Sequence, residues 1–271
     1  MPPDETLRSR ENPLYKRLRA LKERGGDREL CLLEGPKLVL EALAAGLAVV
    51  EAATSPRAEA SPAGASALSA LRGCSVPVRR MTAELHASLS DAEASQGVLA
   101  LARRPVVEEE RVFRGTPLLL VADAVQNPGN LGGLLRTAEA AGASGAILAD
   151  ACADPYSWKA LRGSMGSAFR LPLLRGLTIE QALCVLEARG IVALATAKDG
   201  ERRYDEVDLR GPVALVVGNE GAGLPEAVRA RATARLRIPL AGPVESLNVG
   251  VAAALVLFEA ARQRGFAAGR G

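Results

Sequence analysis

Histidine is almost absent from this sequence of 271 residues. The single histidine, His86, lies far along the chain from the glycine-rich segments of the second half. Its context, Ala-Glu-Leu-His-Ala-Ser-Leu, predicts a helical position with a structural role. The usual histidine general base is therefore not expected, and any proton transfer must involve another group.

Paired cysteines and long apolar runs are also missing. The four cysteines (Cys31, Cys74, Cys152 and Cys184) contain no Cys-x-x-Cys pair, which argues against a metal cluster or disulfide framework and predicts scattered buried thiols. No apolar run reaches the roughly 18 residues that a membrane span requires, and the N-terminus has no apolar signal core. These absences predict a cytoplasmic protein with no metal site and no membrane partner.

The composition is that of an ordinary globular protein, long enough for two domains. Hydrophobic residues make up 48% of the chain and charged residues 24%. The net charge of +3 leans basic, which suits contact with phosphate over part of the surface, although many unrelated proteins share this charge.

The first hundred residues alternate strand-like and helix-like segments, which predicts a small α/β domain. Strands are expected at residues 29–34, 49–53, 76–79 and 98–102, and helices at 37–45, 63–71 and 83–89. An amphipathic helix precedes them, with Asn12 as its cap and Pro13 in its first turn. Its wetter face carries Lys16, Arg17, Arg19 and Lys22, and this face is either an ordinary solvated surface or a surface that contacts phosphate.

A charged, proline-containing run at 103–111 separates two regions of regular apolar spacing and is interpreted as an interdomain linker. The predicted division is 1–104, a linker at 105–116, and 117–271. In the last part, strands at 118–122, 146–148, 191–195 and 213–217 alternate with helices at 131–141, 179–188 and 224–232. This alternation favours an α/β fold with a parallel sheet covered on both faces. The final helix, 247–264, is apolar over most of its circumference and is expected to be buried.

The segment Asn127-Pro-Gly-Asn-Leu-Gly-Gly-Leu-Leu-Arg136-Thr follows a predicted strand and leads into a helix. Asn130 is a candidate cap, with Arg136 on the second turn. A helix N-terminus and an arginine fork both suit an anionic group such as an RNA phosphate. A plain turn followed by a surface arginine is the alternative.

Two further segments lie near the C-terminal end, Gly218-Asn-Glu-Gly-Ala-Gly-Leu224 and Ile238-Pro-Leu-Ala-Gly-Pro-Val-Glu-Ser-Leu-Asn-Val249. The glycines allow close approach of a ligand to the backbone. No Walker A lysine follows, and the spacing is not that of a dinucleotide site, which disfavours a nicotinamide dehydrogenase. Ser246 is a candidate cap of the last helix. Asn248 would lie inside that helix, where asparagine is a poor helix former and needs a hydrogen-bond partner.

Taken together and in this order, the three segments resemble the signature of the SpoU/TrmH family of RNA ribose 2′-O-methyltransferases. The first domain, with Leu33-Glu34-Gly35 and Ser95-Gln-Gly97-Val, resembles the family's RNA-binding domain. The resemblance implies a C-terminal domain with a deep trefoil knot, S-adenosylmethionine as cofactor, RNA as partner, and a homodimer whose active site takes residues from both subunits.

The resemblance also implies residue roles. The catalytic set would be Arg136, Asn130, Glu220, Ser246 and Asn248. The cofactor would be held by Thr196, Gly218, Asn219, Glu220, Gly221, Ile238, Leu240, Ser246 and Leu247. RNA would be contacted by Lys16, Arg17, Arg19 and Lys22.

The role of Arg136 is open at this point, since it could act as the base or as a clamp for the phosphate and the forming alkoxide. Arginine ordinarily stays protonated, which favours the clamp. The separate first domain favours ribosomal RNA as the acceptor. The alternatives are a tRNA enzyme and a catalytically silent RNA-binding or ribosome-assembly factor.

Overall fold

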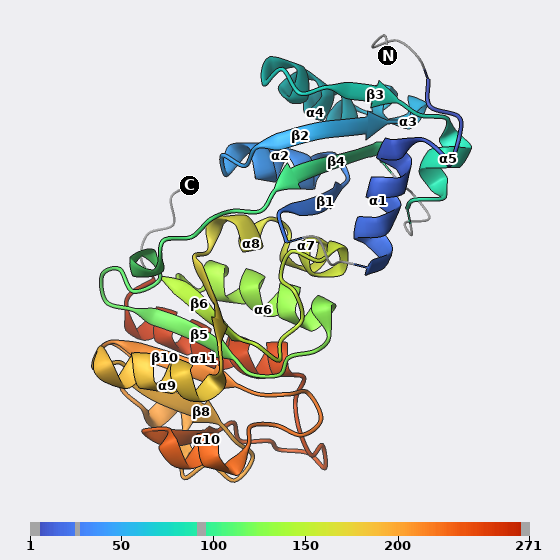
Figure 1. The fold of residues 1–271 in the computed structure, drawn as a ribbon. Coiled ribbons are helices and arrows are strands. Elements are labelled where there is room, and N and C mark those ends of the chain that lie inside the picture. The colour runs from blue at the N-terminus through green and yellow to red at the C-terminus, as the bar shows by residue number, and fades with distance from the viewer. Residues whose placement is uncertain (1–5, 25–27, 91–95, 267–271) are drawn as a thin grey trace. The chain divides into compact units, whose positions relative to one another are not determined.

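The computed structural model describes residues 6–24, 28–90 and 96–266 (Figure 1). The chain forms two compact α/β units, the first from Met1–Val106 with Asp154–Phe169 and the second from Val107–Ala153 with Arg170–Gly271. The boundaries at 104 and 117 stay a prediction, and the segment Asp154–Phe169 joins the first unit by its contacts. Ser95 lies outside the described residues.

The first unit is built on a four-stranded sheet in the order β1-β4-β2-β3. Its strands are β1 (Leu30–Glu34), β2 (Val49–Thr54), β3 (Val78–Arg80) and β4 (Val98–Arg103). β4 runs antiparallel to β1 and β2, and β2 runs parallel to β3. The helices are α1 (Pro13–Arg24), α2 (Pro36–Ala44), α3 (Pro56–Glu59), α4 (Pro62–Gly73), α5 (Ala83–Ala87), α7 (Trp158–Ser164) and α8 (Ser167–Arg170).

Helix α1 begins as the sequence predicts. The Asn12 side chain accepts a hydrogen bond from the Leu14 backbone N–H at 2.9 Å, which satisfies a donor left free at the helix start. Leu14, Leu18 and Leu21 are buried in one core cluster. The amphipathic pattern therefore positions this helix against the sheet.

Trp158, to which the sequence assigned no role, joins that same cluster from α7. Its indole N–H donates to Glu34 at 2.6 Å. The charged ends of Lys22 and Arg162 lie over its ring at 5.0 and 4.9 Å. These contacts hold α7 to the first unit, although α7 lies between two segments of the second unit in the sequence.

The second unit contains a seven-stranded, wholly parallel sheet in the order β7-β6-β5-β10-β8-β11-β9, which confirms the predicted parallel α/β class. The strands are β5 (Leu118–Ala122), β6 (Gly145–Ala149), β7 (Leu173–Leu177), β8 (Val192–Thr196), β9 (Arg202–Arg203), β10 (Val213–Val217) and β11 (Ala234–Arg237). β7, β9 and β11 were not predicted. The trefoil knot stays a prediction.

Helices cover both faces of this sheet. One face packs against α6 (Pro128–Ala140) and α11 (Val249–Gln263), which also contact each other. The other packs against α9 (Ile179–Ala188), followed by α10 (Glu226–Arg231) (Figure 1). β5 and β10 are buried along their whole length because both faces are covered. Short 3₁₀ turns lie at Glu109–Arg111 and Tyr204–Glu206.

The last helix differs from its prediction, because one of its faces is exposed. Val251, Leu255 and Phe258 are 50%, 38% and 42% exposed, whereas Val256 and Leu257 are buried. The exposed three recur at helical spacing and form a row along one face of the helix. An apolar composition alone did not reveal which face the chain itself covers.

The cysteines also differ from their prediction. Cys31 is buried in β1 and Cys152 is half-buried, but Cys74 and Cys184 are exposed. Cys74 ends α4, and Cys184 occupies the outer face of α9. Within the described residues, no helix is long and apolar enough to cross a membrane.

Candidate active site

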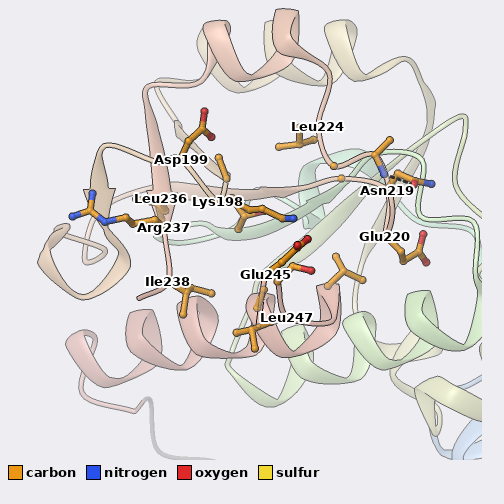
Figure 2. Close-up of a pocket in the computed structure, with 18 of the residues that line it drawn as sticks. Lys198, Asp199, Asn219, Glu220, Leu224, Leu236, Arg237, Ile238, Glu245 and Leu247 are labelled. Carbon is orange, nitrogen blue, oxygen red and sulfur yellow. Dashed lines mark hydrogen bonds between the residues drawn. The ribbon is translucent and has the colours of Figure 1, made fainter. Parts of the chain in front are cut away.

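A cavity of about 740 Å³ opens at the carboxyl ends of β8, β10 and β11 (Figure 2). Its walls are the segments that follow these strands and the loop before α11. Ligands of open parallel sheets bind outside the carboxyl ends of the strands, where loops from neighbouring strands converge. The cavity therefore lies where this fold class places its ligand.

The glycine-rich turn after β10 forms one wall. Asn219 and Gly223 pair through both backbone hydrogen bonds, at 3.2 and 2.9 Å. The Asn219 side chain accepts from the Gly221 and Ala222 N–H groups and donates to the Ala124 carbonyl at 3.0 Å. The turn is thus closed by its own asparagine and tied to the end of β5.

Gly218 is required by this turn itself. A Cβ at Gly218 would lie 2.4 Å from the Gly223 carbonyl carbon and 2.6 Å from the Leu224 nitrogen. The closed turn by itself excludes a side chain at Gly218. Close approach of a ligand is therefore not needed to explain why this residue is a glycine.

Glu220 links the turn to helix α6. Its Oε1 accepts from the Asn127 backbone N–H at 3.3 Å and from the Asn130 side-chain amide at 3.1 Å. Partial burial favours a higher pKa for Glu220, but hydrogen bonds from its own backbone N–H and from Asn130 and Asn127 outweigh it and lower the pKa below its ordinary value. Glu220 is accordingly held as a carboxylate.

The cap of α6 is Asn127 and not Asn130 as predicted. The Asn127 side chain accepts from the Gly129 and Asn130 N–H groups at 2.8 and 3.2 Å. Pro128 occupies the first position of the helix, so α6 begins three residues earlier than the predicted start at residue 131. Arg136 consequently lies on the third turn, exposed.

The cap of α11 is Asn248 and not Ser246. The Asn248 side chain accepts from the Gly250 N–H at 2.8 Å, and its amide donates to Asn130 Oδ1 at 3.4 Å. A cap explains why an asparagine stands at an apolar helix start. Ser246 instead lines the cavity in the preceding loop.

All nine residues expected around the cofactor line this one cavity: Thr196, Gly218, Asn219, Glu220, Gly221, Ile238, Leu240, Ser246 and Leu247. Of the expected catalytic set, Glu220 and Ser246 line it, and Asn130 and Asn248 join Glu220 through the amide contacts described above. Arg136 is not among the lining residues.

The four cations expected to contact RNA lie on α1. Lys16 pairs with Glu11, Arg17 with Glu51 at 3.7 Å, and Arg19 with Glu23 at 2.7 Å. Lys22 is half-buried over the Trp158 ring. Their charge is therefore partly neutralised within the protein, and their role in RNA binding stays a prediction.

Five charged residues of the cavity wall escaped the sequence analysis: Lys198, Asp199, Arg229, Arg237 and Glu245. Arg229 pairs with Asp199 at 2.9 Å, and Arg237 donates to the Gly200 and Glu201 carbonyls. Lys198 directly follows β8, and Glu245 precedes Ser246. Lys198, Arg237 and Glu245 stand within two residues of positions already singled out, whereas Asp199 and Arg229 had no such signal.

The cavity suits a small ligand with both apolar and charged parts. Its volume is in the range of small-molecule sites. Leu236, Ile238 and Leu247 supply apolar wall, while backbone groups and charged side chains supply the polar partners. S-Adenosylmethionine has an apolar-faced adenine, a ribose and a charged methionine end, and it fits this combination of apolar wall, backbone groups and charged side chains.

Family models match both parts of the chain. The SpoU rRNA methylase family matches residues 117–258. The MRM3-like substrate binding domain matches residues 12–100.

Individual proteins match along most of the chain. A 23S rRNA (guanosine(2553)-2′-O)-methyltransferase of Bacillus subtilis is 36% identical over 66% of this chain and 70% of its own length. An uncharacterized tRNA/rRNA methyltransferase of Synechocystis is 34% identical over 96% of this chain and 94% of its own. The crystal structure of an AdoMet-bound rRNA methyltransferase from Sinorhizobium meliloti matches with a TM-score of 0.83 and 31% identity, covering 96% of this chain and 98% of that one.

Proposed function

The chain belongs to the SpoU rRNA methylase family, and from this premise we propose that it methylates a ribose 2′-hydroxyl in ribosomal RNA of the large subunit. It is an RNA ribose 2′-O-methyltransferase that uses S-adenosylmethionine. The observation that carries the proposal is the cavity at the carboxyl ends of β8, β10 and β11, where the second and third motif segments meet.

The cofactor is assigned to this cavity. When bound, it supplies an electrophilic methyl group on a positively charged sulfur. Leu236, Ile238 and Leu247 would pack against its apolar surfaces, and the Gly218–Gly223 turn would present backbone groups. Ser246 lies on the same wall.

The acceptor side is assigned to the start of α6. The bonds among Glu220, Asn130 and Asn248 fix three motif segments to one another at the edge of the cavity. Such fixed groups orient a ribose hydroxyl at low entropic cost, and positioning of this kind supplies much of an enzyme's rate enhancement. Arg136 would act as a clamp and not as a base: it would hold the phosphate beside that ribose and stabilise the developing alkoxide, and the 2′-hydroxyl proton would pass to solvent water as the methyl group moves from sulfur to oxygen.

A homodimer completes this assignment. Val251, Leu255 and Phe258 form an exposed apolar row on α11, and such a row is typical of a surface covered by a partner. Arg136 does not line the cavity of its own chain. Both observations support a second copy packed on this face, with Arg136 of one copy serving the cavity of the other.

The dimer has a direct test. Phe258→Glu places a charge in the apolar row, and sedimentation should change from dimer to monomer. Phe266→Glu, a change at an exposed aromatic beyond the helix, should leave the dimer intact. A monomeric wild-type protein would contradict the assembly without touching the cavity assignment.

Methyl transfer from labelled S-adenosylmethionine tests the activity. Ribosomal RNA from cells that lack the gene should accept one methyl group per target ribose, and tRNA should accept none. Labelling of tRNA instead would favour the tRNA alternative, and labelling of neither would favour the silent RNA-binding factor. With ribosomal RNA as its acceptor, the enzyme is proposed to act in the cytoplasm.

A further inference from the structure

Two charged side chains reach into the cavity from different walls. Lys198 follows β8, and Glu245 lies in the loop before α11. Figure 2 shows both pointing toward the middle of the cavity. The other cations of the wall, Arg229 and Arg237, are engaged by Asp199 and by backbone carbonyls.

The inference rests on the proposed function, which assigns S-adenosylmethionine to this cavity. That ligand carries three charges. S-Adenosylmethionine has a sulfonium and an ammonium, both positive, and a carboxylate. The demethylated product, S-adenosylhomocysteine, has the same ammonium and carboxylate but a neutral thioether. The two molecules therefore differ by one positive charge, located at sulfur.

Glu245 belongs to the loop that leads to the acceptor side of the cavity. It stands three residues before Asn248, whose amide contacts Asn130 at the start of α6. The reactive methyl must face the acceptor, so the sulfur lies toward this side. Lys198 leaves from β8, which is separated from β5 and α6 by β10.

We propose that Glu245 faces the sulfonium and selects the charged donor over its neutral product, while Lys198 binds the carboxylate common to both. A carboxylate near the sulfur stabilises the donor by Coulomb attraction and gives the product no such gain. Loss of the methyl group thus weakens binding, which favours product release. Glu245 lies within the third signature segment, but none of the residue roles that the resemblance implies falls on it.

The expected effect is modest because both side chains are exposed. Solvent-exposed ion pairs contribute up to about 1 kcal/mol, which is about a fivefold change in affinity. Glu245→Gln should therefore lower the affinity for S-adenosylmethionine about fivefold and leave the affinity for S-adenosylhomocysteine nearly unchanged. Lys198→Met should weaken both ligands by the same factor.

Isothermal titration with three ligands tests this on the full-length protein. Sinefungin, which carries a charged amine in place of the methylated sulfonium, should follow S-adenosylmethionine in Glu245→Gln. Glu108→Gln, which removes an exposed carboxylate outside the cavity, should leave all three affinities unchanged. An unchanged ratio of donor to product affinity in Glu245→Gln would overturn the inference, whether neither affinity changes or both fall equally.

A second measurement needs no variant. If a charge at sulfur is recognised, the preference of the wild-type protein for donor over product should shrink as salt rises from about 0.05 to 0.5 M, because salt screens exposed charges. A preference that does not change with salt would contradict the role of Glu245. Failure of the wild-type protein to bind either ligand would instead contradict the proposed function.

Discussion

Oε1 of Glu220 accepts a hydrogen bond from Nδ2 of Asn130 at 3.1 Å, although 90 residues separate them in the chain. The same oxygen accepts from the Asn127 N–H at 3.3 Å. One carboxylate therefore fastens the cavity turn to the start of α6. The position of the acceptor helix relative to the cofactor turn depends on this group.

We expect Glu220→Ala to lower methyl transfer by about a hundredfold, because it removes both links between the turn and α6. Cofactor affinity should fall less, since the turn remains closed by Asn219. Single-turnover rates at saturating cofactor measure the first effect, and titration measures the second. Glu108→Ala is the matched control. A variant with normal turnover would show that other contacts position α6.

Arg136→Ala should lower methyl transfer by a factor on the order of 10²–10³, while leaving cofactor binding and thermal stability nearly intact. The side chain is exposed on α6 and does not line the cavity. Arg136→Lys should remain strongly impaired, since an ammonium cannot hold phosphate with two parallel bonds. Arg114→Ala, which removes an exposed arginine of the same unit, should behave as wild type. Near-normal turnover of Arg136→Ala would disprove the assigned role.

Gly218→Ala should lower stability and cofactor affinity together. Its Cβ would overlap the Gly223 carbonyl at 2.4–2.5 Å, so the turn must open. Gly221→Ala meets no atom closer than 3.6 Å and should fold normally. Chemical unfolding and cofactor titration on both variants separate the two cases. A fully stable Gly218→Ala protein with weakened binding would restore ligand approach as the reason for this glycine.

The sequence predicted the strands best where burial on both faces leaves a continuous apolar run, as in β5 and β10. It failed at β7, β9 and β11, where charged residues such as Arg175, Arg202 and Arg235 interrupt the apolar pattern. Both helix caps were misplaced by two or three residues, because several asparagines and serines compete at each start.

The cavity-lining residues came from the family resemblance and not from physical reasoning on single segments. The contacts of Glu220, Glu245 and Trp158 join residues about 90 to 125 positions apart or depend on loop placement. No local pattern encodes such pairs, which is why these residues received no structural partner from sequence alone.

His86 should stay neutral at pH values well below those at which a histidine side chain ordinarily becomes charged. Burial lowers its pKa from 6.5 to about 4, because the charged imidazole loses its hydration. The unfolded chain then takes up a proton between about pH 6.5 and 4 that the folded chain does not. The contribution of His86 to the free energy of unfolding is therefore fully present above about pH 6.5. It falls by about 3 kcal/mol as the pH drops to 4.

This chain offers a clean measurement, since His86 is the only histidine. Its imidazole resonance in untagged protein should titrate near pH 4. In His86→Gln, the part of the pH dependence of unfolding between 6.5 and 4 that stems from this group should disappear. A midpoint near 6.5 in the folded protein would contradict a buried, neutral imidazole.

RNA binding by α1 is expected to depend on Lys16 and Arg19. Lys16 and Arg19 are exposed but paired with Glu11 and Glu23, so phosphate must displace these acids to bind. If both cations contact phosphate, Lys16→Gln with Arg19→Gln should lower RNA affinity and flatten its salt dependence by about one slope unit per contact. Cofactor affinity should be unchanged, because the cavity belongs to the second unit.

The matched control removes the competing acids. Glu11→Gln with Glu23→Gln frees the same two cations and should raise RNA affinity, since no internal partner then has to be displaced. Point variants are preferable to deletion of residues 1–102, because deletion would take away Glu34 and the core that holds Trp158. An unchanged salt slope in the Lys16 and Arg19 variant, with no gain in the Glu11 and Glu23 variant, would make this face of α1 an ordinary solvated surface.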